Sequence, residues 1–136
     1  MKQTQVDGLT TIASSFGPKE TMDRLEAEIR AQRMTVFARI DHAGGAAEVG
    51  LKLAPTELII FGNARAGTPL MQSVQTVGID LPLKVLVWED AAGKTWLSYN
   101  EPSWIARRHG VRNAEQVLSK MGAALSAIAT KAANSN

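Results

Sequence analysis

Residues 83–99 have the sequence LKVLVWEDAAGKTWLSY, which is the most informative segment for the fold class. Two apolar runs, 83–89 and 94–99, flank the short segment 90–93, in which an aspartate and a glycine favour a turn. This pattern predicts a β-hairpin. Because the strands of a hairpin are antiparallel, we expect an antiparallel-rich sheet and no doubly wound parallel one.

Both faces of the predicted hairpin are largely apolar. Alternation along the strands separates Lys84, Leu86 and Trp88 from Val85, Val87 and Glu89, and Trp96 and Ser98 from Leu97 and Tyr99. If helices cover one face, the other exposes more apolar surface than a monomer usually tolerates. We therefore predict a homodimer whose interface includes Trp88 or Trp96, the alternative being that short helices cover this face.

The elements around the hairpin are predicted from apolar spacing and turn residues. Further strands are expected at 9–15, 34–40 and 58–61, a long helix at 18–33, and short helices at 46–53, 70–77 and 102–109. Asn113 is the expected N-cap of a last long helix, and 132–136 should be a frayed end. The chain is thus predicted to be α+β, with the two long helices packed on one sheet face.

The predicted core follows from the apolar stripes of the two long helices. We expect these stripes to be buried against the sheet: Leu25 and Ile29 in the first helix, and Leu118, Met121, Leu125 and Ile128 in the last.

Length and composition favour one ordered domain spanning residues 1–136. Apolar residues make up 45% and charged residues 21% of the chain, which is typical of globular proteins. With no cysteine, disulfides, thiol catalysis and cysteine-ligated metals are excluded. The net charge of +2 is weak evidence for a polyanionic partner. Neither a membrane-spanning run nor a signal-peptide core is evident, so we expect a cytoplasmic protein.

Asp41 and His42 follow a predicted strand and precede a glycine pair. Loops at strand ends commonly carry reactive groups, so His42 is the candidate general acid or base, oriented by Asp41. The alternative is that Asp41 makes an Asx turn and His42 is a solvated side chain. No metal-ligand spacing surrounds His42 or His109, so neither a metal nor a cofactor is expected, and His109 should serve a helix end and solvent.

The segment 62–68 lies between a predicted strand and a predicted helix. It lacks the lysine of a phosphate-binding P-loop, but Asn63, Arg65 and Thr68 beside a helix N-terminus are candidates for holding a small anion. The alternative is an ordinary turn between strand and helix. Lys84, placed near Tyr99, is expected to be either a ligand contact or a structural hydrogen-bond donor.

One basic cluster stands out, formed by Arg107, Arg108, His109 and Arg112. No helix-turn-helix, RNP or GXXG signature accompanies it. We interpret it as a solvated helix end, and nucleic acid is not an expected partner.

Several motifs in order carry a family resemblance: Phe37-Ala38-Arg39-Ile40-Asp41-His42, Gly50, Pro55, Leu58-Ile59-Ile60-Phe61-Gly62-Asn63, Gly67-Thr68-Pro69-Leu70-Met71-Gln72, Asp80-Leu81-Pro82-Leu83-Lys84 and Tyr99-Asn100. Over about residues 10–130 the chain resembles the family catalogued as domain of unknown function 302. The resemblance implies a β-α-β4-α fold similar to the TATA-box-binding-protein class and no established activity. Ala64 departs from the proline common in the family. The fold likeness implies no DNA binding, because function belongs to sites.

Polar side chains at predicted strand ends suggest a binding site formed by Asp41, His42, Asn63, Lys84, Tyr99 and Asn100. Our leading hypothesis is a non-enzymatic homodimer that binds a small polar or anionic ligand or a protein. An enzyme is the first alternative, with His42 moving a proton while Lys84 or Asn63 stabilises an anion. A purely structural dimeric module is the second alternative.

Overall fold

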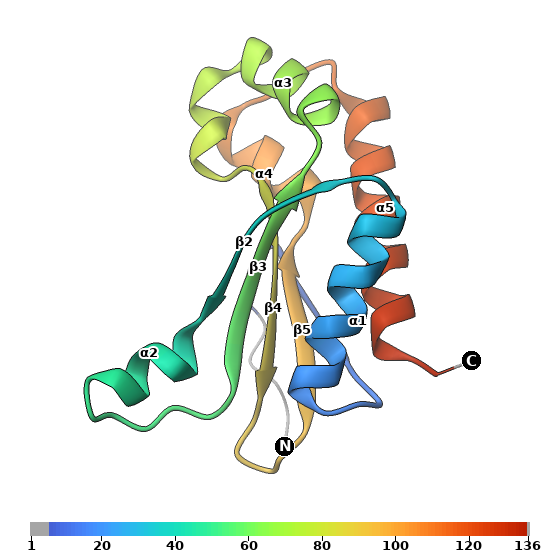
Figure 1. Cartoon of the computed structure of the whole chain (residues 1–136). Helices are drawn as coiled ribbons and strands as arrows, with labels where there is room; N and C mark the ends of the chain where they lie inside the picture. Colours follow the sequence, from blue (N-terminus) through green and yellow to red (C-terminus); the bar gives the residue numbers. More distant parts are fainter. Residues whose placement is uncertain (1–5, 136) are drawn as a thin grey trace.

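A computed structural model describes residues 6–135, and in that range the strands form one antiparallel sheet in the order β1-β5-β4-β3-β2 (Figure 1). The strands are β1 (Leu9–Ala13), β2 (Thr35–Asp41), β3 (Thr56–Gly62), β4 (Leu83–Glu89) and β5 (Thr95–Asn100). The predicted hairpin is confirmed as β4 and β5, with Trp88 opposite Trp96.

Two long helices, α1 (Pro18–Ala31) and α5 (Glu115–Ala133), lie side by side on one face of this sheet (Figure 1). The predicted stripes supply the core: Leu25, Ile29, Met121, Leu125 and Ile128 are buried, whereas Leu118 is only partly buried. The α+β class and the β-α-β4-α order are confirmed. Short helices interrupt that order: α2 (His42–Glu48), α3 (Ala64–Ser73), the 3-10 helix η1 (Gln75–Ile79) and α4 (Pro102–His109).

The two faces of the sheet differ in what covers them. Val85 and Val87 of β4 lie under the helices, with 0% and 1% of their surface exposed. In the described part of the chain, no helix lies across the other side (Figure 1). We call this side the open face, and its residues alternate with the buried ones along each strand: Thr11, Leu58, Ile60, Lys84, Leu86, Trp88, Trp96 and Ser98.

Arg39 joins three elements on the helix-covered side. Its guanidinium makes two 2.9 Å hydrogen bonds to Glu57 of β3, and it also contacts Glu26 at 2.9 Å and Asp23 at 3.2 Å on α1. These carboxylates raise the pKa of Arg39 further above its ordinary value, the bonds to Glu57 contributing most and partial burial opposing them. The network therefore fastens the β2–β3 pair to α1.

Several element boundaries differ from the prediction. The helix expected at 46–53 begins at His42, because the Asp41 side chain accepts a 2.9 Å hydrogen bond from the Gly44 amide and caps α2. The helix expected at 70–77 begins at Ala64, ends at Ser73 and is followed by η1, so Pro69 lies inside α3 rather than at its start. The first strand ends at Ala13, not at residue 15.

Both ends of α5 also correct the prediction. Asn113 adopts a left-handed φ of 58° and is not the N-cap; the helix begins at Glu115. The helix α5 continues to Ala133, so it includes the first two residues of the segment 132–136 that is expected to be frayed. Ala132 and Ala133 are buried, and the Arg24 guanidinium donates to the carbonyls of Lys131, Ala132 and Asn134 at 2.8–3.0 Å.

Candidate functional site

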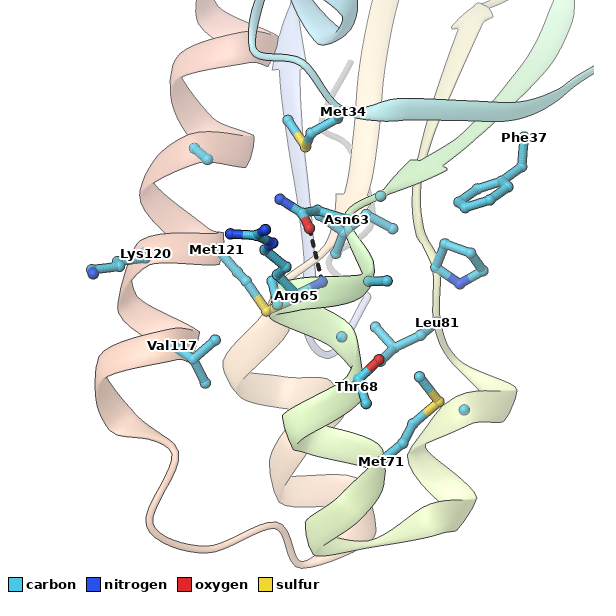
Figure 2. A pocket seen from close by; sticks show the side chains of 18 of the residues that line it. Met34, Phe37, Asn63, Arg65, Thr68, Met71, Leu81, Val117, Lys120 and Met121 are labelled. Atoms are coloured by element: carbon cyan, nitrogen blue, oxygen red, sulfur yellow. Dashed lines mark hydrogen bonds between the residues drawn. The ribbon is translucent and has the colours of Figure 1, made fainter.

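A cavity of about 660 Å³ opens where the end of β3 meets α3, between the segment preceding β4 and the helix α5 (Figure 2). This volume lies within the range of small-molecule sites. Much of its lining is apolar: Met34, Phe37, Met71, Leu81, Val117 and Met121. Three of these side chains are methionines, which adapt to ligands of different shape.

The first turn of α3 supplies the polar part of the cavity. The Asn63 side chain caps the helix by accepting a 2.8 Å hydrogen bond from the Arg65 amide. Figure 2 shows the side chains of Asn63 and Arg65 between Met34 and Met121. Helix N-termini carry a partial positive charge, so this turn favours an anionic group.

Two cations line the cavity, Arg65 on α3 and Lys120 on α5. The described residues that line it include no aspartate or glutamate. Within residues 6–135, neither cation forms a salt bridge. The cavity therefore combines an apolar lining with unneutralised positive charge.

The structure brings together only part of the predicted site. Asn63, Arg65 and Thr68 all line the cavity, and their role in holding an anion stays a prediction. Of the six residues expected to gather at strand ends, only Asn63 lies there. The expectation that Asp41, His42, Asn63, Lys84, Tyr99 and Asn100 share one concavity is wrong.

Lys84 and Tyr99 are separated by the sheet itself. Lys84 belongs to the open face, where its ammonium donates to the carbonyls of Asp80 and Pro82 at 3.2 and 3.1 Å. Burial lowers the pKa of Lys84, partly opposed by the Asp80 carboxylate. Tyr99 is buried in the core on the opposite face, where burial raises the pKa of its hydroxyl, and Asn100 is exposed at the end of β5. The predicted proximity of Lys84 and Tyr99 is therefore wrong.

Asp41 and His42 lie far from the cavity, where β2 runs into α2. The Asp41 carboxylate is engaged as the cap of α2, and His42 is exposed at the first position of that helix. The enzyme hypothesis required His42 to open into a pocket beside an orienting group. His42 does not line this cavity, and within residues 6–135 its side chain forms no salt bridge.

A cluster that the sequence analysis missed joins η1 to α4. The Asp80 carboxylate bonds to His109 Nε2 and to the Arg108 guanidinium, both at 2.6 Å, and Thr76 bonds to His109 Nδ1 at 3.0 Å. Burial raises the pKa of Asp80, but these bonds outweigh it and the net shift is downward. His109 is thus not a solvated helix end, as its basic neighbours had suggested. The cluster holds the segment 78–83 that forms one wall of the cavity.

The described part of the chain contains neither a metal-binding group nor a membrane-spanning helix. Among residues 6–135, no three His, Asp or Glu side chains form a group that could hold a metal ion. In the same range, no helix is both long and apolar enough to cross a membrane.

Comparison with known proteins identifies the family. Residues 10–128 match the family described as "Domain of unknown function DUF302". The chain belongs to this family. A crystal structure of an uncharacterized conserved DUF302 protein from Bacillus stearothermophilus has the same fold, with a TM-score of 0.83 and 20% identity over 93% of this chain and 99% of that one.

Curated relatives of this DUF302 chain carry the name of an ion channel. "Fluoride-specific ion channel FluC 1" of Brucella suis biovar 1 (strain 1330) is 49% identical over 113 residues, covering 83% of this chain but 44% of that protein. The protein of the same name from Brucella abortus biovar 1 (strain 9-941) is also 49% identical, with 42% of its length covered. The chain thus spans less than half the length of the curated relatives it matches.

Proposed function

We propose that this DUF302 domain binds a small molecule with an apolar body and an acidic group, in the cavity between α3 and α5. The observation that carries the proposal is a largely apolar lining that includes Arg65 and Lys120, neither of which forms a salt bridge within residues 6–135. A carboxylate or phosphate would pair with these cations and with the first turn of α3. The apolar body would contact Met34, Met71 and Met121.

The charge of the site argues against a neutral or cationic ligand. A cation would meet Arg65 and Lys120 with no carboxylate among the described lining residues to offset them. A small hydrated anion would leave the methionine lining without a partner. An amphipathic acid satisfies both halves of the cavity, because it buries apolar surface while its acidic group stays near the rim.

Displacement of 1-anilinonaphthalene-8-sulfonate, an aromatic sulfonate, tests this proposal. We expect the dye to fluoresce in the cavity and to be displaced by octanoate at lower concentration than by octanol or octylamine. The double substitution Arg65→Ala and Lys120→Ala should weaken octanoate binding about tenfold, as expected for the loss of charge-assisted contacts, and leave octanol unchanged.

The matched control is Arg112→Ala combined with Lys131→Ala, which removes two exposed cations outside the cavity lining. It should bind octanoate like the unmodified chain. Equal losses in both double variants would show that only the net charge matters, and absence of any saturable dye binding would overturn the proposal.

A second proposal rests on the Brucella relatives. They are named for fluoride channels, yet this chain matches less than half of each, and in its described residues no helix could cross a membrane. We propose that the DUF302 segment of such proteins lies outside the bilayer, on the cytoplasmic side, and modulates the channel through the cavity ligand.

The predicted likeness to the TATA-box-binding-protein class stays a prediction.

Fluoride efflux from vesicles tests this second proposal. The Brucella suis relative would be reconstituted whole and with the DUF302 segment deleted. We expect efflux to persist after deletion but to lose its response to added octanoate. A deletion that leaves both the rate and the octanoate response unchanged would contradict a modulating role.

A further inference from the structure

The open face is apolar, and its polar groups are already satisfied within the chain. Trp88 and Trp96 stack with ring centroids 6.2 Å apart. Their indole N–H groups donate to Ser98 and to Asp90, each at 2.9 Å. Ser98 also bonds to Thr11, and Lys84 donates to two backbone carbonyls. A surface with few unsatisfied donors fits an apolar occupant better than a polar one.

The charges of this face do not suit nucleic acid. Lys84 is the one charged residue among those that define the open face, and its ammonium is held by its own chain. Binding to a phosphate backbone requires several free lysines or arginines. The occupant we infer is therefore protein.

A second apolar surface lies at the far end of the β2–β3 pair. We call residues 42–54, which comprise α2 and the loop after it, the arm; it projects away from α1 and α5 (Figure 1). No residue of α2 is buried. Val49, Leu51 and Leu53 are 72%, 66% and 49% exposed. A helix of seven residues gains little stability by itself, so burial against another surface would stabilise the arm.

The exposed area of the chain is sufficient for an interface. The chain exposes 8308 Å². A folded monomer of this mass typically exposes about 6,900 Å². The excess, roughly 1,400 Å², exceeds the ~800 Å² that each partner buries in a standard protein interface. Val49, Leu51 and Leu53 of the arm, which are 49–72% exposed, are part of this exposed surface.

We propose that two copies of this chain form a two-fold dimer in which the arm of each copy packs on the open face of the other. The dimer places Leu51 and its neighbours against Leu86 and the two stacked tryptophans. Because a two-fold interface uses the same patches on both chains, one arrangement covers both arms and both open faces. This interface is separate from the proposed ligand cavity, so either proposal can fail without the other.

Sedimentation equilibrium tests the dimer. We expect a species of two 14.6 kDa chains at about 10 µM. Leu51→Asp should raise the dissociation constant at least about tenfold, because it places a charge in an apolar interface. Leu51 is largely exposed, so this variant should fold. The control Ile79→Asp alters an apolar residue that is 75% exposed but lies on η1, outside both surfaces, and should leave the dimer intact.

Cysteine crosslinking tests the arrangement, because the chain has no cysteine of its own. Oxidising a mixture of the Leu51→Cys and Leu86→Cys variants should give a disulfide-linked heterodimer. Circular dichroism of each variant establishes that it is folded.

Three outcomes would overturn the proposal. A chain that stays monomeric at about 100 µM shows no interface of the expected size. A dimer that Leu51→Asp leaves unchanged does not use the arm. Disulfides that form only between two copies of the Leu51→Cys variant, and never with the Leu86→Cys variant, would contradict the packing of arm on face.

Discussion

The two faces of the sheet are built from adjacent residues of the same strands, yet helices cover only one of them in the described chain. Val85 and Val87 have at most 1% of their surface exposed, because α1 and α5 cover them. Leu86 and Trp88, their neighbours along β4, face a side that no helix crosses in the described chain. Strand chemistry alone therefore does not decide burial. The two long helices decide which apolar face becomes the core.

The two strand-to-helix junctions differ in the same way. Asp41 ends β2 and Asn63 follows β3, and each caps the next helix through a side-chain oxygen. Asn63 lies opposite α5, so its helix encloses a cavity. Asp41 leads into the arm, where no residue of α2 is buried. The cavity lies at the Asn63 junction because α5 faces it.

The largest expected effect distinguishes the two faces. Leu125→Ala removes a buried side chain of α5 and should lower the free energy of unfolding by about 2–5 kcal/mol. Leu86→Ala on the open face should cost the monomer roughly 1 kcal/mol, because the side chain is only partly buried. Urea unfolding followed by circular dichroism measures both. A loss below about 0.5 kcal/mol for Leu125→Ala would show that α5 is peripheral.

A smaller effect concerns the ion network on the helix-covered side. Hydrogen bonds from Lys19 and Arg39 lower the pKa of Asp23, and those from Arg39 and Arg30 lower the pKa of Glu26. Because the folded pKa values lie below the unfolded ones, the stabilisation is full above about pH 4.5 and is lost as these carboxylates protonate at lower pH.

Arg39→Met tests this network. It should lower the free energy of unfolding by about 1–2 kcal/mol at pH 7, since it leaves three carboxylates without their shared partner. At pH 3 the difference from the unmodified chain should shrink. Thermal unfolding at the two pH values measures it, and a difference independent of pH would mean that Arg39 acts through packing alone. Arg112→Met, at an exposed position outside the network and outside the arm, is the control.

The smallest effect compares the two helix caps. Asn63→Ala should cost about 1 kcal/mol of global stability, the usual value for a lost N-cap, because α3 packs with the core through Leu70. Asp41→Ala should change the global value by less than about 0.5 kcal/mol and instead speed amide hydrogen exchange within the arm. Equal losses would show that the arm belongs to the cooperative core.

Local sequence patterns predict the hairpin, the two long helices and most of their buried stripes. Alternation over 83–89 and helical spacing through Leu25, Ile29 and Leu125 are local patterns, and they needed no knowledge of the rest of the chain. The sequence also placed Asn63, Arg65 and Thr68 in one candidate anion site, because all three belong to a single short segment.

Packing between distant segments determines which other residues join that site and which do not. Lys120 and Met121 line the cavity because α5 faces α3 across it, and Asp80 meets His109 across 29 positions of sequence. Lys84 and Tyr99 belong to one hairpin but lie on opposite faces of the sheet. Helix starts at His42 and Ala64 were missed because one side-chain cap at each site outweighed the local glycine and proline signals. Contacts between distant segments depend on packing, and no local pattern encodes them.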